Sequence, residues 1–528
     1  MKRRQFLAAT AASVAAPMTA PSVRAANATK TIRFTPQADL ALLDPVFTTG
    51  LVTRNHGFLV FDQLYGLDEH FNPQPQMVEG HVVDNDGKTW TITLRDGLMF
   101  HDGEKVVARD AIASIQRWGK TDAFGQNLMA VTDELSAVDD KTFRFKLKKP
   151  FPLLPAALAK PSSYCPVMPE RLAKTPVNVQ VTEMVGSGPF RFIAAERLAG
   201  ARAVYEKFQG YVPRPSGTPS FAAGPKVVYV DRVEWVTIPD ASTAASALQH
   251  GEIDWWEQPT PDLIPLLRKD PKIAVEAKEK GGLMGMIRFN CLVPPFDNPA
   301  IRRAFLAGVD QAEYMTAVMG DDKSLWNDRC GFFLPASPFA TEAGLEVMTG
   351  PRDLDKVKRD LQAAGYKGEK VVFVVPTDLP ALNAMSQIAA DMFKRVGINL
   401  DYQALDWGTV LPRLANKEGL DKGGWSVWCN YIPGVIAITP ATQSYVRGMG
   451  RAGPFGWPTS EKIEALRSDF LDAQSTEEQK RITRDLQLQA WQDVPYIPTG
   501  AWMQPFAFSR SLTDILDGFP LFWNVKKA

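Results

Sequence analysis

The sequence predicts a large α/β protein built from more than one lobe. The chain has 528 residues, which is more than a single hydrophobic core usually organises. Hydrophobic residues make up 45% and charged residues 22%, the balance of a folded globular protein. Strand-like and helix-like hydrophobic periods alternate along the chain. Both kinds of element are therefore expected in one fold.

The first 25 residues read as a secretory signal. A basic start at residues 2–4 precedes an Ala-rich apolar stretch, and Val23-Arg24-Ala25 offers a cleavage site. Arg3 and Arg4 before Gln5-Phe6-Leu7 are similar to a twin-arginine signal, which exports folded proteins. The alternative is an ordinary Sec signal that carries two arginines. We expect a mature protein that begins at Ala26.

The charge balance and the hydropathy of the chain argue against nucleic acid as a partner and against attachment to a membrane. Lys+Arg and Asp+Glu both number 59, so no basic excess exists to hold nucleic acid. No cysteine follows the signal, which argues against a lipid anchor, and no later stretch reaches the roughly 20 apolar residues of a membrane span. These features predict a protein free in the periplasm.

The early part of the chain predicts a small α+β lobe. Residues 89–94 alternate polar and apolar side chains, which is typical of a half-buried strand. Turn signals at Asp96-Gly97 and 101–103 follow, and 110–118 reads as a short helix. Apolar residues at alternate positions in 143–147 predict a further strand.

The later part predicts a parallel or mixed sheet covered by helices. Asn298-Pro299 marks one helix start and Asp310 marks another. Residues 371–375 form a continuous apolar strand, the stripe from 382 to 396 predicts a helix, and 398–402 alternate again. This order is a βαβ unit.

Motifs for catalysis are missing. The chain has no Gly-x-Ser-x-Gly elbow, dinucleotide fingerprint, phosphate loop or His-Glu-x-x-His. Its five histidines are dispersed, and its four cysteines stand singly at 165, 291, 330 and 429, so a disulfide stays open. We therefore name no catalytic residue, metal ligand or cofactor. An exported hydrolase or redox enzyme remains the alternative of another class, because triads assemble in space.

Several segments together resemble one family. The longest is WTITLRDGLMFHDG at 90–103, followed by ARDA at 108–111. Shorter matches are LDP at 43–45, VFDQLY at 60–65, VGSGPF at 185–190, FN at 289–290, PPF at 294–296, IRRA at 301–304, GW at 424–425 and VPYIP at 494–498. In this order they resemble the periplasmic solute-binding proteins of peptide/nickel-type ABC transporters, extracellular solute-binding family 5.

The resemblance implies a bilobed periplasmic-binding-protein fold of type II, with three domains, mixed sheets and a hinge. Domain I would comprise 27–65, 185–285 and 481–528, domain II 66–184, and domain III 286–480. Strands near 286–290 would join the lobes. Such a protein closes on a solute and delivers it to the permease subunits of an importer. We expect a monomer without enzymatic activity.

The expected ligand site departs from the family's pattern. Peptide-binding relatives place an Asp shortly after the Gly-Trp pair to hold the peptide's amino group, but Trp428 stands there, and no acid occurs between Lys422 and Arg447. This suggests an aromatic cleft for a solute without a free amine. The alternative is that Trp428 packs inside domain III and an acid arrives from elsewhere. The candidate ligand-binding residues are Trp425, Trp428, Asn430, Tyr431, Arg54 and His56.

The predicted function is therefore the substrate-binding receptor of an ABC importer. Within this class, a dipeptide or oligopeptide competes with an amine-free aromatic or apolar solute. A nickel chelate or haem is a further alternative, because the family includes such ligands.

Overall fold

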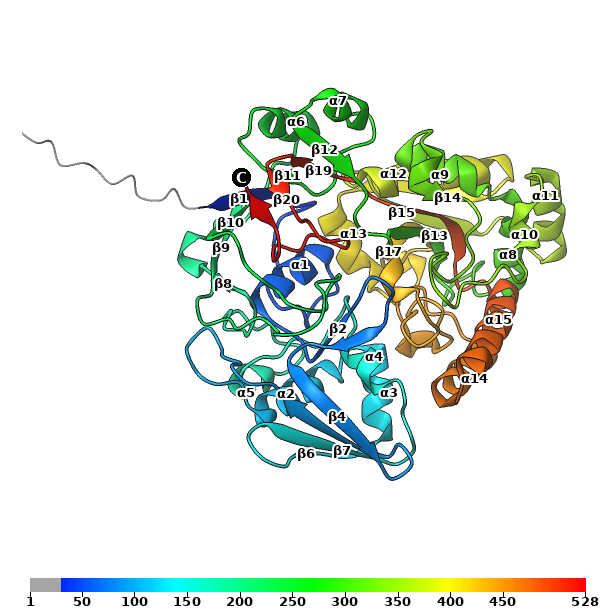
Figure 1. Cartoon of the computed structure of the whole chain (residues 1–528). Helices are drawn as coiled ribbons and strands as arrows, with labels where there is room; N and C mark the ends of the chain where they lie inside the picture. Colours follow the sequence, from blue (N-terminus) through cyan, green and yellow to red (C-terminus); the bar gives the residue numbers. More distant parts are fainter. Residues whose placement is uncertain (1–29) are drawn as a thin grey trace, which may run out of the picture.

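Three main sheets organise the protein. The computed structural model describes residues 30–528, so the predicted signal at 1–25 and the predicted start at Ala26 lie outside the described residues. The sheets contain seven, six and four strands, and we call them the β1 sheet, the β13 sheet and the β5 sheet after one strand of each. Figure 1 shows the β5 sheet at the bottom and the β13 sheet at the right.

The β1 sheet combines strands from both ends of the described chain. Its order is β12-β19-β11-β1-β10-β9-β8, and β1 runs parallel to both of its neighbours. The strands are β1 (Thr31–Thr35), β8 (Phe190–Phe192), β9 (Arg202–Lys207), β10 (Arg232–Val236), β11 (Trp255–Trp256), β12 (Ile273–Glu276) and β19 (Phe506–Ser509). Phe34 contacts the rings of Trp235, Trp255 and Phe522 in an aromatic core.

Helix α1 (Leu51–Val60) lies in the middle of the molecule, as Figure 1 shows. Every residue from Val52 to Val60 is buried, including the polar residues of the sequence Thr-Arg-Asn-His. Buried polar side chains need partners, so this helix must find them in the segments around it. The other helices beside the β1 sheet are α6 (Ala241–Gln249) and α7 (Ile264–Lys269).

The β5 sheet is antiparallel, in the order β4-β5-β7-β6. Its strands are β4 (Val78–Asp84), β5 (Thr89–Leu94), β6 (Thr132–Ala137) and β7 (Thr142–Leu147). Helices α2 (Ala108–Trp118), α3 (Ala123–Val131), α4 (Leu154–Leu158) and α5 (Glu170–Ala173) accompany it, with a hairpin of β2 (Tyr65–Leu67) and β3 (Pro73–Pro75). The predicted strands at 89–94 and 143–147 and the helix near 110–118 are confirmed.

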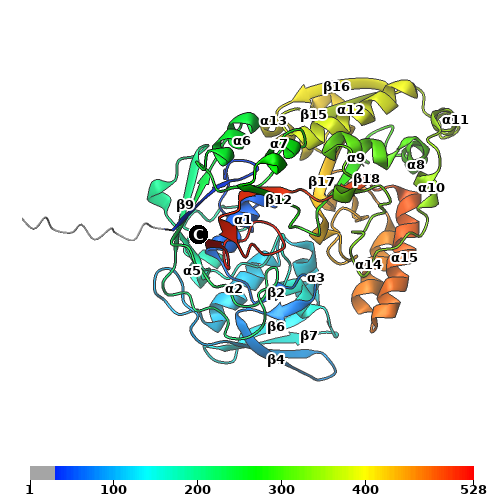
Figure 2. The same cartoon turned by 45° about the horizontal axis from the view of Figure 1, so that its top comes forward.

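The β13 sheet is mixed, in the order β14-β18-β13-β17-β15-β16. Its strands are β13 (Leu283–Phe289), β14 (Trp326–Asn327), β15 (Lys370–Pro376), β16 (Asn399–Leu405), β17 (Val427–Pro433) and β18 (Ile497–Trp502). The predicted βαβ unit is confirmed, because β15 and β16 are parallel and α12 (Pro380–Arg395) connects them. Figure 2 shows α12 beside these two strands.

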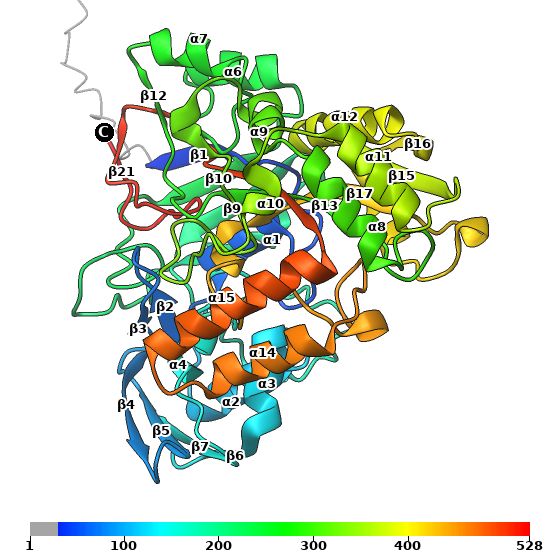
Figure 3. The same cartoon turned by 90° about the vertical axis from the view of Figure 1, so that its right-hand side faces the viewer.

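The remaining helices pack around the β13 sheet. The side chains of Asn298 and Asp310 cap α8 (Pro299–Ala304) and α9 (Gln311–Met319), as the sequence predicts. Two long helices, α14 (Glu461–Asp472) and α15 (Thr476–Asp493), run side by side in Figure 3. The others are α10 (Glu346–Thr349), α11 (Leu354–Ala363) and α13 (Trp407–Leu414).

Two short segments cross between the β1 and β13 sheets. Residues 277–282 lead from β12 to β13, and residues 503–505 lead from β18 to β19. The first crossing lies earlier than the segment near 286–290 that the sequence suggested, because β13 already begins at Leu283. Gly282 has a φ of 53°, and a Cβ there would meet the Trp502 carbonyl oxygen at 2.3 Å. The two crossings therefore touch.

The proposed division into three domains stays a prediction. Strand β18 pairs with β13 and β14, so part of the C-terminal segment expected in domain I belongs to the β13 sheet. The last residues return to the β1 sheet side, where β20 (Leu512–Thr513) pairs with β21 (Lys526–Lys527).

Candidate ligand-binding site

Arg54 of α1 faces the first crossing segment. Its Nη1 lies 3.7 Å from Oε1 of Glu279, and its guanidinium carbon lies 4.0 Å from the centroid of the Phe519 ring. Its Nε and Nη2 donate hydrogen bonds to Oδ1 of Asn55 at 3.1 and 3.0 Å. The Arg54 side chain is 4% exposed and that of Glu279 is 14% exposed. The pair thus ties α1 to the crossing at 277–282.

Glu257 is a second buried acid beside this pair. It follows β11 and is 4% exposed. Its Oε1 accepts a hydrogen bond from Nδ2 of Asn55 at 2.8 Å, and its Oε2 accepts one from the backbone N–H of Gln37 at 2.8 Å. Burial raises the pKa of Glu257 to about 7, although Arg54 and these hydrogen bonds oppose the shift.

The β13 sheet reaches the same place through Tyr431. Burial raises the pKa of the Tyr431 phenol to about 12, and the negative charge of Glu257 contributes to the shift. The Tyr431 ring also packs edge-on against Trp502, with the ring centroids 5.4 Å apart. The Tyr431 phenol therefore lies within electrostatic range of an acid that follows the β1 sheet strand β11.

A small pocket of about 20 Å³ opens at Glu279. Segments from distant parts of the chain meet there, including the loop after β2, the first crossing, the turn after β17 and the C-terminal segment. Its lining residues are Glu69, Phe71, Phe221, Lys278, Glu279, Lys280, Gly281, Val435, Asp517 and Gly518.

The Arg54–Glu279 pair leaves hydrogen-bonding capacity unused. Nη1 of Arg54 and Oε1 of Glu279 are both buried and make no hydrogen bond among the described residues. A buried polar atom without a partner is costly, so a polar group that enters between them would be stabilised. We call Arg54, Asn55, Glu257 and Glu279, together with Tyr431, which interacts electrostatically with Glu257, the charged cluster.

The two predicted tryptophans lie elsewhere in the β13 sheet. Trp425 and Trp428 belong to a hydrophobic cluster with Trp457 and apolar residues of β15 and α13. Trp428 is 2% exposed, and its ring stacks on that of Trp407 with centroids 6.2 Å apart. These contacts agree with the alternative given by the sequence analysis, in which Trp428 packs inside this part of the protein. Its indole Nε1 is buried without a hydrogen-bond partner among the described residues.

The other two predicted residues also have protein partners. Nδ2 of Asn430 donates a long hydrogen bond of 3.4 Å to the Tyr445 hydroxyl. His56 is fully buried beside the β1 sheet, where its Nδ1 lies 2.9 Å from the Tyr205 hydroxyl and its Nε2 lies 3.2 Å from the sulfur of Met184. Burial lowers the pKa of His56 to about 3, so its ring is neutral. Of the six predicted residues, Arg54 and Tyr431 both interact electrostatically with Glu257, and Trp425 and Trp428 share one hydrophobic cluster.

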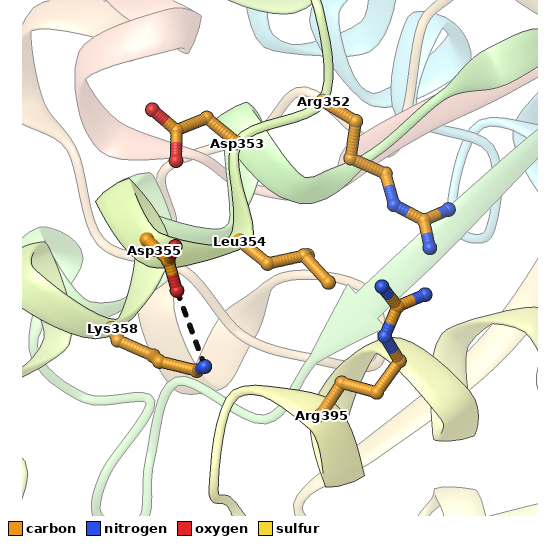
Figure 4. A pocket seen from close by; sticks show the side chains of 6 residues that line it. All are labelled: Arg352, Asp353, Leu354, Asp355, Lys358 and Arg395. Carbon is orange, nitrogen blue, oxygen red and sulfur yellow. Dashed lines mark hydrogen bonds and ion pairs between the residues drawn. The ribbon is translucent and has the colours of Figure 1, made fainter.

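A second hollow lies between the start of α11 and the end of α12, and Figure 4 shows it from close by. It has a volume of about 450 Å³ and surrounds the N-terminus of α11. Its charged side chains already have ion-pair partners: Arg352 with Glu313, Lys358 with Asp355, and Arg395 with Asp391. Leu354 and Asp353 complete the lining. None of the six predicted residues lies there.

Neither metal ligands nor disulfides accompany the charged cluster. Within residues 30–528, no group of three or more His, Cys, Asp or Glu side chains is arranged to hold a metal ion. The four cysteines carry free thiols. In the same part of the chain, no helix has the length and apolar character needed to cross a bilayer.

Comparison with known protein families identifies the family to which the chain belongs. The model of bacterial extracellular solute-binding proteins, family 5, matches residues 72–445, which is well over half of the chain. The chain belongs to this family. It is thus the substrate-binding protein of a peptide/nickel-type ABC importer, a class of binding proteins and not of enzymes.

Individual relatives agree with this family 5 assignment. The chain is 35% identical over 530 residues to the "Probable peptide ABC transporter periplasmic-binding protein y4tO" of Sinorhizobium fredii, with 98% of each chain covered. It is 25% identical to the glutathione-binding protein GsiB of Pectobacterium atrosepticum, with 97% of this chain and 95% of that protein covered.

Solved structures share the fold of this family 5 protein. The periplasmic binding protein DppA of Helicobacter pylori, in complex with the peptide STSA, superimposes with a TM-score of 0.78 at 20% identity. The match covers 94% of this chain and 98% of that chain. The mixed α/β architecture is therefore that of the peptide-binding group of solute-binding proteins, as the sequence predicts.

The sequence analysis did not select Glu257, Glu279 or Asn55 of the charged cluster. Glu257 directly follows two tryptophans, and Glu279 stands in the charged segment Lys278-Glu279-Lys280. Such segments are usually solvated, so neither residue stood out. Asn55 gave a weak signal, because an Arg-Asn pair inside an otherwise apolar helix must be satisfied by buried partners.

Proposed function

We propose that this family 5 protein captures a peptide-like solute in the periplasm and presents it to the permease subunits of its transporter. The observation that supports the proposal is the Arg54–Glu279 pair, which has unused hydrogen-bonding atoms and whose Glu279 lines a small pocket where distant segments meet. The similarity to y4tO and GsiB supports a peptide-like ligand and a periplasmic location.

The chemistry of the charged cluster suits such a solute. A peptide group offers a carbonyl oxygen that can accept from Nη1 of Arg54 and an N–H that can donate to Oε1 of Glu279. Both protein atoms lack hydrogen bonds among residues 30–528. Hydrogen bonds to charged groups are worth about 1.5–3 kcal/mol each. Phe71, Phe221 and Val435 add apolar surface around the pocket.

The position of Glu279 between the two sheets suggests that ligand binding favours closure of the two lobes. Glu279 lies in one crossing between the sheets, so a ligand bound to it contacts the hinge and both lobes together. A ligand shifts the open–closed equilibrium only by its differential affinity for the closed state.

The proposed contact residues include part of the set predicted from sequence. Arg54 and Tyr431 belong to the charged cluster, and we assign them to the ligand site. Ligand contact by Trp428, Trp425, Asn430 and His56 stays a prediction. Trp428 could reach a ligand only through its buried indole edge, because its ring packs against Trp407.

Purified mature protein tests the proposal. Native mass spectrometry should reveal a small molecule that co-purifies with the protein, and its fragments should contain peptide or amide bonds. Calorimetry with a panel of dipeptides and tripeptides should then give saturable binding that Arg54→Met abolishes. The exposed residue Arg329, which pairs with Glu342 on the surface, provides the matched control in Arg329→Met. A co-purified ligand without amide character, together with no binding by the panel, would contradict the proposal.

A further inference from the structure

We propose that two ion pairs on the protein surface stabilise the closed arrangement of the two lobes when no ligand is bound. We call the part built on the β1 and β5 sheets the first lobe and the part built on the β13 sheet the second lobe. The two pairs are Lys149–Asp472 and Arg268–Asp322, and we call them the interlobe pairs. The inference goes beyond the proposed function, because it concerns the motion of the lobes and holds for any solute.

The first interlobe pair joins the β5 sheet to α14. Nζ of Lys149, which follows β7, lies 2.5 and 2.7 Å from the two carboxylate oxygens of Asp472 at the end of α14. The neighbouring Lys148 stays within its own lobe, where its Nζ donates a hydrogen bond to the carbonyl oxygen of Ala130. Figures 2 and 3 show α14 next to the helices of the β5 sheet. Lys149 is therefore the lysine of this segment that contacts the second lobe.

Asp472 needs a cation from outside its own helix. It is the last residue of α14, where the partial negative charge of the helix end disfavours a carboxylate. The last turn of α14 contains no basic residue, and Asp469 adds a second acid to it. Lys149 supplies the cation from the first lobe. Separation of the lobes would leave this carboxylate with water alone.

The second interlobe pair joins α7 of the first lobe to the segment before β14 of the second. Nη1 of Arg268 lies 3.2 Å from Oδ2 of Asp322. Oδ1 of Asp322 accepts a hydrogen bond from the backbone N–H of Ser324 at 3.2 Å, which orients the carboxylate. Arg268 lies in the last turn of α7, where a cation is favourable. Both halves of the first lobe thus have a charged contact with the second lobe.

Exposure distinguishes the interlobe pairs from an ion pair inside the first lobe. Arg117 of α2 donates to both oxygens of Asp44 at 3.1 and 2.6 Å, and these side chains are 2% and 0% exposed. The side chains of the interlobe pairs are between 37% and 47% exposed. Breaking a buried pair strands its charges away from water, whereas an exposed pair separates into water at little cost. The first lobe therefore moves as one unit, and the interlobe pairs can break and re-form.

The strength of the interlobe pairs suits a reversible closure. An exposed pair shifts an equilibrium by about two- to fivefold, and two distant pairs together shift it by about four- to twenty-fivefold. Such a bias favours the closed form and still allows the protein to open for a solute. Salt weakens exposed pairs, because the Debye length falls from about 30 Å at 0.01 M to about 3 Å at 1 M. Closure should therefore weaken as the salt concentration rises.

Charge exchange tests the first interlobe pair. The sample is mature protein freed of co-purified solute by unfolding in urea, dialysis and refolding, and small-angle X-ray scattering measures its radius of gyration. Asp472→Lys places two lysines opposite each other and should increase the radius. The double variant Lys149→Asp with Asp472→Lys re-forms the pair with opposite polarity and should return the radius to the wild-type value. Raising the salt concentration over the range above should also increase the wild-type radius. The same exchange at Arg268 and Asp322 tests the second pair.

An ion pair within the β5 sheet provides the matched control. Nζ of Lys146 lies 2.6 Å from Oε2 of Glu134 on the neighbouring strand, with both side chains about as exposed as those of the first interlobe pair. Glu134→Lys changes the net charge as Asp472→Lys does, but it should leave the radius unchanged.

Three outcomes would overturn the inference. They are an unchanged radius in Asp472→Lys, an increase that the double variant does not reverse, and an equal increase in Glu134→Lys. Each of them leaves the proposed peptide-like ligand intact, because calorimetry tests that ligand separately.

Discussion

Nη1 of Arg54 lies 3.7 Å from Oε1 of Glu279, and this contact joins the central helix α1 to the first crossing between the β1 and β13 sheets. The ion pair is mostly buried, and each of the two atoms lacks a hydrogen bond within residues 30–528. A pair of this kind is poorly satisfied in the protein alone. A ligand that bonds to these atoms can therefore stabilise the folded protein and also shift the relative position of the two sheets.

A double-mutant cycle should measure how strongly the pair depends on both charges. Arg54→Met leaves Glu279 buried beside a second acid, so we expect the free energy of unfolding to fall by about 3–5 kcal/mol, the range for breaking a buried pair. Glu279→Gln in the same chain should recover part of that loss. Urea unfolding of the two single variants and the double variant gives the coupling energy. Additive effects would show that the two side chains do not interact.

Glu257 should make stability depend on pH. Burial raises its pKa from an ordinary value of 4.5 to about 7, so the folded protein binds a proton more tightly than the unfolded chain. Its contribution is fully present below pH 4.5 and is lost as pH rises towards 7. The difference of about 2.5 pKa units corresponds to about 3 kcal/mol.

Thermal unfolding of the wild type and Glu257→Gln between pH 4 and 8 measures this contribution. The amide does not titrate, so the stability of the variant should fall less over this range than that of the wild type. Parallel curves would contradict the assignment.

Trp428→Ala should destabilise the fold. The ring is buried against Trp407 in a hydrophobic cluster, and removing such a side chain costs about 3–5 kcal/mol. The sequence alone suggested a loss of ligand affinity of ~1–3 kcal/mol without unfolding. Trp428→Phe keeps most of the packing and serves as the comparison for calorimetry. Full stability of Trp428→Ala, together with weaker ligand binding, would restore the site predicted from sequence.

The paired arginines of the signal should control export. Replacing Arg3 and Arg4 by Lys keeps the basic charge but removes the twin-arginine pattern. The amount of mature protein in the periplasmic fraction should fall sharply, which immunoblotting of cell fractions can measure. A single replacement at Arg24, outside the pair, is the matched control. Unchanged export of the double variant would assign the protein to the Sec route.

Ligand binding should make the protein more compact. Gly282 of the first crossing packs against Trp502 and Met503 at the start of the second, and we expect the two crossings to act as one hinge. Small-angle X-ray scattering should show a smaller radius of gyration at saturating ligand than without ligand. The same profile in both states would indicate a rigid protein.

The family and most local elements were predictable from the sequence. The strand at 89–94 and the βαβ unit at 370–405 follow from hydrophobic period, which depends on residues that are near in sequence. The helix starts at Asn298 and Asp310 follow from capping, which is also local. The order of the short motifs pointed to family 5, and the family model agrees.

The candidate site was predictable only in part. Arg54 was selected for its position after the LDP motif, and Tyr431 for its place near the Gly-Trp pair. The tryptophans at 425 and 428 were selected for their chemistry, and the structure buries both in a hydrophobic cluster. An aromatic side chain packs equally well in a hydrophobic core and against a ligand. Its position along one strand does not show which of these contacts it makes.

The sequence by itself determined the fold class, the family and the absence of an acid between residues 422 and 447. Only the tertiary structure decided which distant charged residues meet at the first crossing. Arg54, Glu257 and Glu279 are each more than 20 residues from the next along the chain, and they meet because α1, β11 and the first crossing converge. Electrostatic interaction depends on distance in space and on exclusion of water, and neither is encoded in any single local segment.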